Sequence, residues 1–214
     1  MRDEIATTEK YRAEFEDKLR VLLKNIGEVQ IGKVGQFPYG WRRSAKGRTV
    51  WRILEELVSQ NLEAQAEAIG LQEFAPADSE VGVYDFSFRL GKSETIFVNI
   101  KSSVVGRSTS KDDISKAEKL IAFLKSISQP TLFIATVEIE FLVDPLRIEL
   151  RNCYVVPTIW LPDIYVNPSN NGNVQSAKYK DLSAAVRRSR VEFIELLEDR
   201  VAGARQKRMK KLDA

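Results

Sequence analysis

The chain has 214 residues, of which 43% are hydrophobic and 29% are charged, and its formal net charge is +3. These values are typical of one compact globular unit with a sizeable core, and they exclude a uniformly basic nucleic-acid coat protein. Histidine is absent and cysteine occurs once, which excludes Ser-His-Asp and Cys-His catalysis and mixed Cys/His zinc sites.

The same composition indicates a compartment and a chemistry. No window approaches the roughly 20 apolar residues of a membrane span, and the first residues do not form a signal peptide. The single cysteine, Cys153, excludes a disulfide framework within the chain and points to a reducing compartment. We therefore expect a cytoplasmic protein with no membrane partner, whose acid-base groups are carboxylates, lysine, tyrosine or metal-activated water.

Residues 1–30 are predicted to be an N-terminal helix. Apolar residues recur between Ile5 and Ile26, and Gly27 then provides a stop signal. The role expected of this helix is packing or dimer contact.

Residues 31–48 change to glycines, aromatic residues and cations, with no acidic residue among them. The glycines deny a regular helix, and the aromatics are too frequent for a plain linker. One interpretation is a packed surface loop with ordinary charges. The other is a DNA-facing loop whose cations contact phosphates or base edges. The cations that we expect to bind DNA are Arg42, Arg43, Lys46 and Arg48.

Residues 49–69 give the clearest helical pattern, with a core stripe that runs from Val50 to Leu62 and Gly70 at the end. Glu56 lies just off this stripe, and Glu55 precedes it. On helix geometry alone, either carboxylate is more often a solvated surface residue than a functional one.

Residues 81–101 read as a β-hairpin with a turn at Gly91. Asp85 would lie near the end of the first strand. Asn99 and Lys101 would lie near the end of the second strand, on one face, because side chains alternate along a strand. The expected result is a carboxylate, an amide and an ammonium at the edge of an apolar sheet.

Charged groups at the mouth of an apolar sheet are costly unless they pair or hold an ion. A divalent cation would compensate the carboxylate charge, with Asp85 and the main-chain carbonyl of Ile100 as its ligands. Lys101 would then orient a water or stabilise the charge on a phosphate. The alternative is a surface hairpin in which Asp85 and Lys101 form an ordinary salt bridge.

The remaining elements complete a mixed sheet. A helix is expected from about Ser110 to Ser128, with Asp112 and Asp113 in its cap. Residues 131–143 and 146–160 read as strands, which gives a four- or five-stranded mixed sheet flanked by helices. Residues 183–214 read as a final charged helix with a frayed basic tail.

Residues 161–182 form a loop rich in amide side chains. Asparagine and glutamine can bond an adenine edge through two hydrogen bonds, although Asn-Gly and Pro-Ser-Asn are also strong turn formers. We interpret this segment as a DNA-recognition loop, with Asn173, Gln175 and Lys178 as the expected contacts.

Asp85, followed after thirteen residues by Asn99-Ile100-Lys101 between apolar strand residues, resembles the core motif of the PD-(D/E)XK nuclease superfamily. The resemblance covers roughly residues 40–180, with residues 49–160 as the catalytic core, and it is supported by the segments GWR…S..GR and WLPDIYVNP. It implies an α/β (α+β) fold with a restriction-endonuclease-like core. It also implies a catalytic set of Asp85, Asn99, Lys101 and a helix glutamate, with Glu56 the best match and Glu55 the alternative.

Two positions depart from that motif. Tyr84 stands where the motif has proline, and Asn99 stands where it has aspartate or glutamate. An amide offers a carbonyl oxygen but no charge, so metal affinity should fall. Asn99 is either a natural variant or a replacement of an original aspartate, and Asn99→Asp should preserve or raise Mg²⁺-dependent cleavage.

The resemblance implies a type II restriction endonuclease of a bacterium or archaeon, within a restriction-modification system. Such an enzyme cleaves double-stranded DNA with Mg²⁺ held by Asp85, Asn99 and Ile100, acts as a homodimer, and needs no organic cofactor. Two alternatives remain. One is a DNA-binding module whose nuclease site has decayed, and the other is a structure-specific repair nuclease on the same core.

Overall fold

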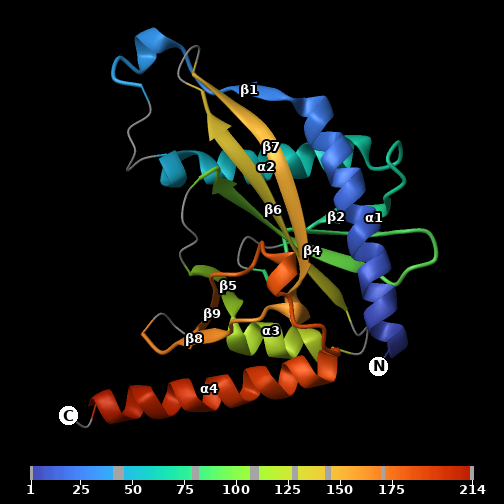
Figure 1. Ribbon diagram of the computed structural model, residues 1–214, viewed down its shortest axis with the longest axis vertical. Coiled ribbons are helices and arrows are strands. Elements are labelled where there is room, and N and C mark those ends of the chain that lie inside the picture. Colours follow the sequence, from blue (N-terminus) through green and yellow to red (C-terminus); the bar gives the residue numbers. More distant parts are fainter. Residues whose placement is uncertain are drawn as a thin grey trace.

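A six-stranded mixed sheet forms the centre of the computed structural model (Figure 1). Its order is β1-β7-β6-β4-β3-β2; β4 and β6 are parallel and the other neighbouring pairs are antiparallel. The strands are β1 (Glu28–Gln30), β2 (Gln72–Pro76), β3 (Phe86–Arg89), β4 (Ile96–Val104), β6 (Thr131–Phe141) and β7 (Arg147–Pro157). The structure describes residues 2–40, 46–78, 82–106, 111–126, 130–142, 146–169 and 172–212.

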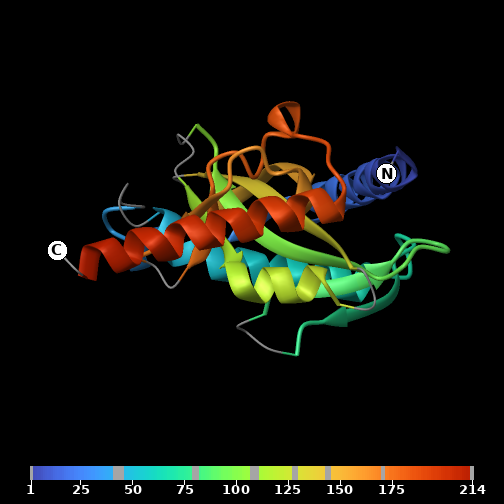
Figure 2. The same cartoon turned by 90° about the horizontal axis from the view of Figure 1, so that it is seen from below.

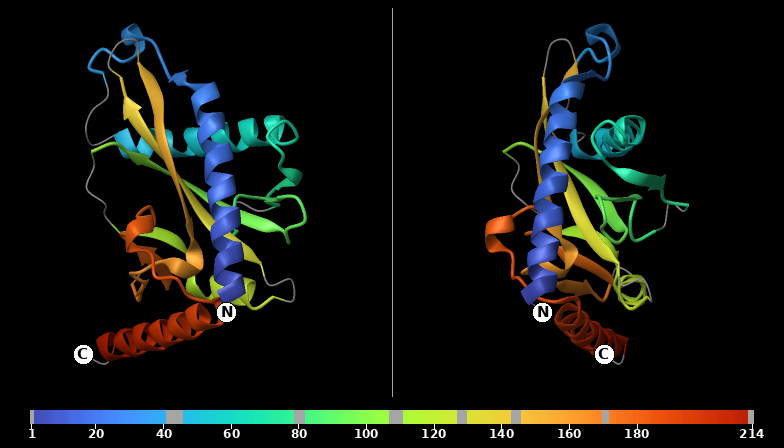
Figure 3. Two further views of the ribbon diagram at one scale, coloured as in Figure 1. Left: turned by 45° about the vertical axis from the view of Figure 1, so that its right-hand side comes forward. Right: turned by 90° about the vertical axis from the view of Figure 1, so that its right-hand side faces the viewer.

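Four α-helices flank this sheet. They are α1 (Arg2–Ile26), α2 (Lys46–Gln65), α3 (Ala117–Leu124) and α4 (Arg190–Leu212), with short 3-10 turns at Val34–Gln36, Thr158–Trp160 and Leu182–Ala184. Helices α1 and α2 pack their apolar stripes on one face of the sheet, while α3 and α4 pack on the other. The predicted mixed sheet with flanking helices is therefore confirmed (Figure 3).

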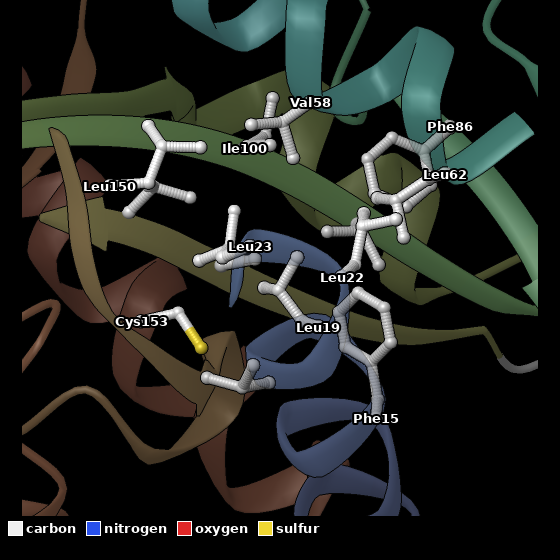
Figure 4. Close-up of a cluster of buried hydrophobic side chains, with 14 of the residues drawn as sticks. Phe15, Leu19, Leu22, Leu23, Val58, Leu62, Phe86, Ile100, Leu150 and Cys153 are labelled. Atoms are coloured by element: carbon white, nitrogen blue, oxygen red, sulfur yellow. The ribbon is translucent and has the colours of Figure 1, made fainter. Parts of the chain in front are cut away.

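The core between α1, α2 and the sheet is dense and aromatic (Figure 4). Phe15 of α1 packs on Phe86 and Phe88 of β3, with ring centroids 6.4 and 4.7 Å apart. Each such fully buried side chain contributes about 1.5 to 3 kcal/mol to stability. Val58 of α2 and Ile100 of β4 belong to the same core, which holds α2 against β4 and positions the functional residues described below.

Helix α4 lies along α3 when the molecule is seen from below (Figure 2). Phe193 and Leu197 are fully buried in this contact, and Lys125 and Glu198 form an ion pair beside it. The helix continues to Leu212, so the residues predicted to be a frayed tail extend it instead. Within the described residues, no helix is long and apolar enough to cross a membrane.

A second sheet, which the sequence did not predict, occupies the amide-rich segment. It has the order β5-β9-β8, formed by β5 (Asp112–Lys116), β8 (Tyr165–Asn167) and β9 (Asn173–Ser176). The prediction that Asp112 and Asp113 cap a helix was wrong, because both residues pair with β9 in this sheet. The main sheet also has six strands rather than four or five, since β1 and β2 add to its edges.

Candidate functional site

The hairpin of β3 and β4 leaves one edge of β4 without a neighbouring strand. Phe86 begins β3 opposite Val98, whereas β4 continues to Val104. Asp85 takes over at this point: its backbone N–H donates to the Val98 carbonyl at 2.8 Å, and its Oδ2 accepts from the Ile100 N–H at 2.7 Å. The carboxylate therefore substitutes for the missing strand partner.

The carbonyl of Ile100 faces the same open edge. The N–H and C=O of one strand residue point to the same side, and the Ile100 N–H points at Asp85. The Ile100 side chain is only 4% exposed and anchors this part of β4 in the core. Asp85 and a main-chain oxygen are thus brought together, as the sequence predicted.

Asn99 and Lys101 project from the face of β4 opposite to the Ile100 side chain. The Asn99 amide donates from Nδ2 to the Val83 carbonyl at 3.3 Å, which ties β4 to the segment before Asp85. Its Oδ1 is buried and accepts no hydrogen bond from any described residue. A buried carbonyl oxygen without a donor is costly, and a cation or water would satisfy it.

Lys101 is half-buried, and its ammonium makes no ion pair within the described part of the chain. In the parallel register it lies beside Thr136, whose Oγ1 is also buried without a partner among those residues. The ordinary salt bridge between Asp85 and Lys101 is therefore absent from the described contacts. Asn99 Oδ1 and Thr136 Oγ1 thus have no hydrogen-bond partner, and Lys101 Nζ has no ion-pair partner, among the described residues.

Of the two candidate carboxylates of α2, Glu55 lies near the charges of Asp85 and Lys101, whereas Glu56 faces solvent. The side chain of Glu56 is exposed and accepts a hydrogen bond from Gln60 at 2.7 Å. Glu55 is half-buried and senses the charges of Lys101 and Asp85. The geometry of the docked helix therefore favours Glu55, which the sequence offered as the alternative to Glu56.

Burial raises the pKa of Glu55 to about 7, with the nearby charge of Asp85 adding to the rise and Lys101 opposing it. Desolvation also raises the pKa of Asp85, although the Ile100 N–H and the charge of Lys101 pull it back. Asp85 is exposed as a whole residue, so water still reaches part of it. Burial disfavours the charged form of both carboxylates, and a bound cation would stabilise that form.

The oxygen atoms at this edge fit as ligands of a hard divalent cation. They are the Asp85 and Glu55 carboxylates, the Ile100 carbonyl and the unpartnered Asn99 Oδ1, and such oxygens are the ligands that Mg²⁺ prefers. Within the described ranges, no group of three or more His, Cys, Asp or Glu side chains lies close enough to hold a metal ion. The set therefore depends on the amide and the main chain as well as on carboxylates.

A second polar cluster beyond Lys101 was missed by the sequence reasoning. Lys180 donates to Ser103 Oγ at 3.3 Å and to Glu138 at 3.1 Å, and Tyr154 donates to the same carboxylate at 3.1 Å. The residues come from segments far apart in the chain, so their spacing carried no signal. Lys180 and Glu138 are mostly buried, and their cluster continues the polar row of β4 past Lys101.

The expected DNA contacts of the amide-rich segment are bonded within the small sheet or just after it. Asn173 and Gln175 donate to Asp113 at 3.2 and 2.7 Å, and Lys178 pairs with Asp181 at 3.3 Å. The expected contacts Arg42 and Arg43 lie outside the described residues, as do the side chains of Lys46 and Arg48.

Comparisons with known proteins found likeness among solved structures alone. No protein-family model matches the chain, and no curated protein matches it. Among solved structures, the NlaIV restriction endonuclease is similar with 12% sequence identity and a TM-score of 0.42, over 63% of this chain. The aligned part spans 53% of the NlaIV chain, about half its length. The residues of the site itself therefore have to carry the functional conclusion.

Proposed function

We propose that this protein is a Mg²⁺-dependent endonuclease that hydrolyses phosphodiester bonds in double-stranded DNA, as type II restriction enzymes do. The observation that supports this most is the convergence of Glu55, Asp85 and Lys101 at the open edge of β4. Two desolvated carboxylates beside an ammonium without an ion pair are suited to a cation and a phosphate, and they give little to stability. Such perturbed groups are characteristic of functional sites.

Each residue has a role that follows from its position. Asp85, the Ile100 carbonyl and the Asn99 Oδ1 would hold the cation, and Glu55 would supply the second carboxylate. A bound Mg²⁺ would supply positive charge to the phosphate and make water a better nucleophile. Lys101 carries three N–H donors, which suit it to hold a phosphate oxygen and to orient the attacking water. The water oxygen bonds to phosphorus as the bond to the 3′ oxygen breaks; the water gives up a proton to solvent, and the 3′ oxygen takes one up from solvent.

The substrate and assembly follow from the same proposal. A homodimer places one site on each strand of a duplex and reads a two-fold symmetric sequence. Arg42, Arg43, Lys46 and Arg48 would contact the DNA from the segment before α2. Asn173, Gln175 and Lys178 would do so from the small sheet only by exchanging their internal hydrogen bonds for bonds to DNA.

Asn99 favours a second candidate, a DNA-binding module with a disabled site. An amide in place of a carboxylate removes one negative charge from the ligand set, which weakens cation binding. Such a module would bind DNA in EDTA and cut it in no metal.

Digestion of a sequenced, unmethylated phage DNA with the purified protein tests these candidates. Parallel reactions contain Mg²⁺, Mn²⁺ or EDTA, and the ends of any fragments are mapped. We expect discrete fragments with identical ends in Mg²⁺ and none in EDTA. Fragments that depend on nicks or flaps would indicate a structure-specific nuclease. A shifted DNA band without cleavage would favour the binding module, and digestion with Asn99→Asp would then show whether restoring the charge restores the enzyme.

A further inference from the structure

The first half of α2 presents an unusual exposed surface next to the site. Val50 and Leu54 face the core with 0 and 1% exposure, whereas Trp51 and Ile53 are 39 and 52% exposed. Large apolar side chains at this exposure cost solvation without adding to the core. Trp51 lies four residues before Glu55 and therefore on the same side of the helix, so it borders the candidate site.

Arg52 is held on this surface by its aromatic neighbour. Its guanidinium carbon lies 4.8 Å from the centroid of the Trp51 ring, within the range of a cation–π contact. Arg52 is exposed, and within the described ranges it forms no ion pair with a carboxylate. A guanidinium stacked on a ring keeps its N–H donors in the plane of the group and free to face outward.

Arg52 also lies within electrostatic reach of the site. Burial raises the pKa of Glu55, and the positive charge of Arg52 opposes this rise, as the charge of Lys101 does. Positions 52 and 55 are three residues apart and therefore neighbours on the helix surface. Helix α2 shares its core with β4, and Lys101 lies in the second half of that strand. The two cations thus border the carboxylates from two different elements.

We propose that Arg52, stacked on Trp51, binds a DNA backbone phosphate that flanks the phosphate held at Lys101. This inference rests on the proposed nuclease function and adds a substrate-binding residue to it. Guanidinium groups match phosphate oxygens through paired hydrogen bonds, and the ring reduces the side-chain freedom lost on binding. A surface arginine with no such role would leave DNA binding unchanged when neutralised.

The salt dependence of DNA binding measures this interaction directly. Affinity falls with salt because each neutralised phosphate releases counterions, with a slope of about 0.9 per phosphate on duplex DNA. Fluorescence anisotropy of a labelled mixed-sequence duplex gives the slope for the full-length protein in EDTA. We expect Arg52→Gln to lower the magnitude of the slope by about 0.9 for each phosphate that the variant no longer neutralises.

Lys10→Gln is the matched control. Lys10 is an exposed cation beside an aromatic neighbour, 5.7 Å from the Tyr11 ring centroid. It lies in the first half of α1, towards the end of the molecule marked N in Figure 1, away from the N-terminal end of α2. Its slope should equal that of the wild type, and thermal unfolding should show both variants folded.

A second measurement places the phosphate. In a duplex containing the mapped cut site, one phosphate at a time is replaced by an uncharged methylphosphonate. We expect one position beside the cut to weaken wild-type binding as much as Arg52→Gln does, with no further loss when both changes are combined. Trp51→Ala should keep the salt slope but weaken binding several-fold, because the guanidinium is no longer held.

The outcomes separate this inference from the proposed function. If the wild type cuts DNA while Arg52→Gln and Lys10→Gln have the wild-type slope, the phosphate contact is wrong and the nuclease stands. If the wild type neither binds nor cuts DNA, both are wrong. If Arg52→Gln lowers the slope in a wild type that binds without cutting, the contact stands and the nuclease assignment falls.

Discussion

The open edge of β4 and the small sheet β5-β9-β8 are both rich in polar residues, but more of these residues are hydrogen-bonded to described residues in the small sheet than at the edge of β4. In the small sheet, Asp113 accepts from Asn173 and Gln175, and Gln175 in turn accepts from Asn167. At the edge of β4, Asn99 Oδ1 has no described partner, and burial raises the pKa of both carboxylates.

Asp163 shows how the small sheet and the segments beside it satisfy most of their polar groups, although Asn173 Oδ1 is buried there without a described partner. It accepts hydrogen bonds from Ser176 Oγ and from the backbone N–H groups of Ala177 and Lys178, at 2.5, 2.7 and 3.3 Å. A carboxylate with several donors stabilises the folded state. The edge of β4 instead holds polar groups at a cost, which is typical of a surface selected for a ligand.

The largest effect that would test this contrast is the loss of Asp85. Asp85→Asn keeps an oxygen that can accept from the Ile100 N–H, so the fold should persist. The charge needed by the cation is gone, and we expect Mg²⁺-dependent cleavage to fall by about 10³-fold or more. Initial cleavage rates on phage DNA, with thermal unfolding as the folding control, measure this. If the variant cleaves DNA at the wild-type rate, Asp85 is not part of the site.

Glu55→Gln should separate function from stability. The folded state holds a proton on Glu55 up to its raised pKa of about 7, against an ordinary value of 4.5, so wild-type stability falls as pH rises between these values. The glutamine removes this dependence. After a discount for the water that reaches this half-buried side chain, we expect the variant to be more stable at pH 8 by about 1 to 2 kcal/mol.

The same variant should lose most cleavage activity, whereas Glu56→Gln, on the exposed neighbour, should change neither property. Urea unfolding at pH 5 and pH 8 and cleavage rates at pH 8 test all three proteins. A loss of activity in Glu56→Gln with a normal Glu55→Gln would make Glu56 the helix carboxylate of the site.

Asn99→Asp tests the edge of β4 by adding a negative charge instead of removing one. The added charge should strengthen cation binding, because affinity rises with the number of charged oxygens. We expect cleavage to be kept or raised, with half-maximal activity at a several-fold lower Mg²⁺ concentration. A Mg²⁺ titration of the cleavage rate measures this, and an inactive but folded variant would count against the metal assignment.

Asp163→Ala, beside the small sheet, should lower stability and leave activity unchanged, the opposite of the effects expected for Glu55→Gln. Ser176 Oγ and the Ala177 N–H lose their acceptor, while the Lys178 N–H keeps Ser176 Oγ at 3.0 Å. We expect the protein to be destabilised by about 2 kcal/mol, with cleavage by the folded fraction unchanged. Urea unfolding and cleavage below the transition give the two values. A large loss of specific activity without destabilisation would assign Asp163 to the site.

The smallest effect is expected for Gln175→Ala. Both ends of this amide are bonded inside the sheet, so it should weaken binding to the cut site by less than about tenfold. Binding to cognate and mixed-sequence duplexes measures this. A selective loss of cognate binding would show that Gln175 leaves Asp113 to read a base.

Local patterns in the chain were enough to predict the hairpin, the apolar stripe of α2, and the alternation that brings Asn99 and Lys101 to one face near Asp85. These features depend on periods of two and 3.6 residues, which the order of residues records directly. Strand pairing is not recorded in that way. The pairing of Asp112 and Asp113 with β9 overrode a plausible helix cap, because the partner lies about sixty residues away.

Tertiary packing set the different exposure of Glu55 and Glu56, and it placed Lys180 against Glu138. Both outcomes depend on how a helix or loop docks on the sheet, and adjacent helix positions differ by about a quarter of a turn. Burial then raised the pKa of Glu55, because desolvation is a property of the packed neighbourhood and not of the residue. The amino-acid order supplied the reactive groups, and packing selected which of them were left without partners.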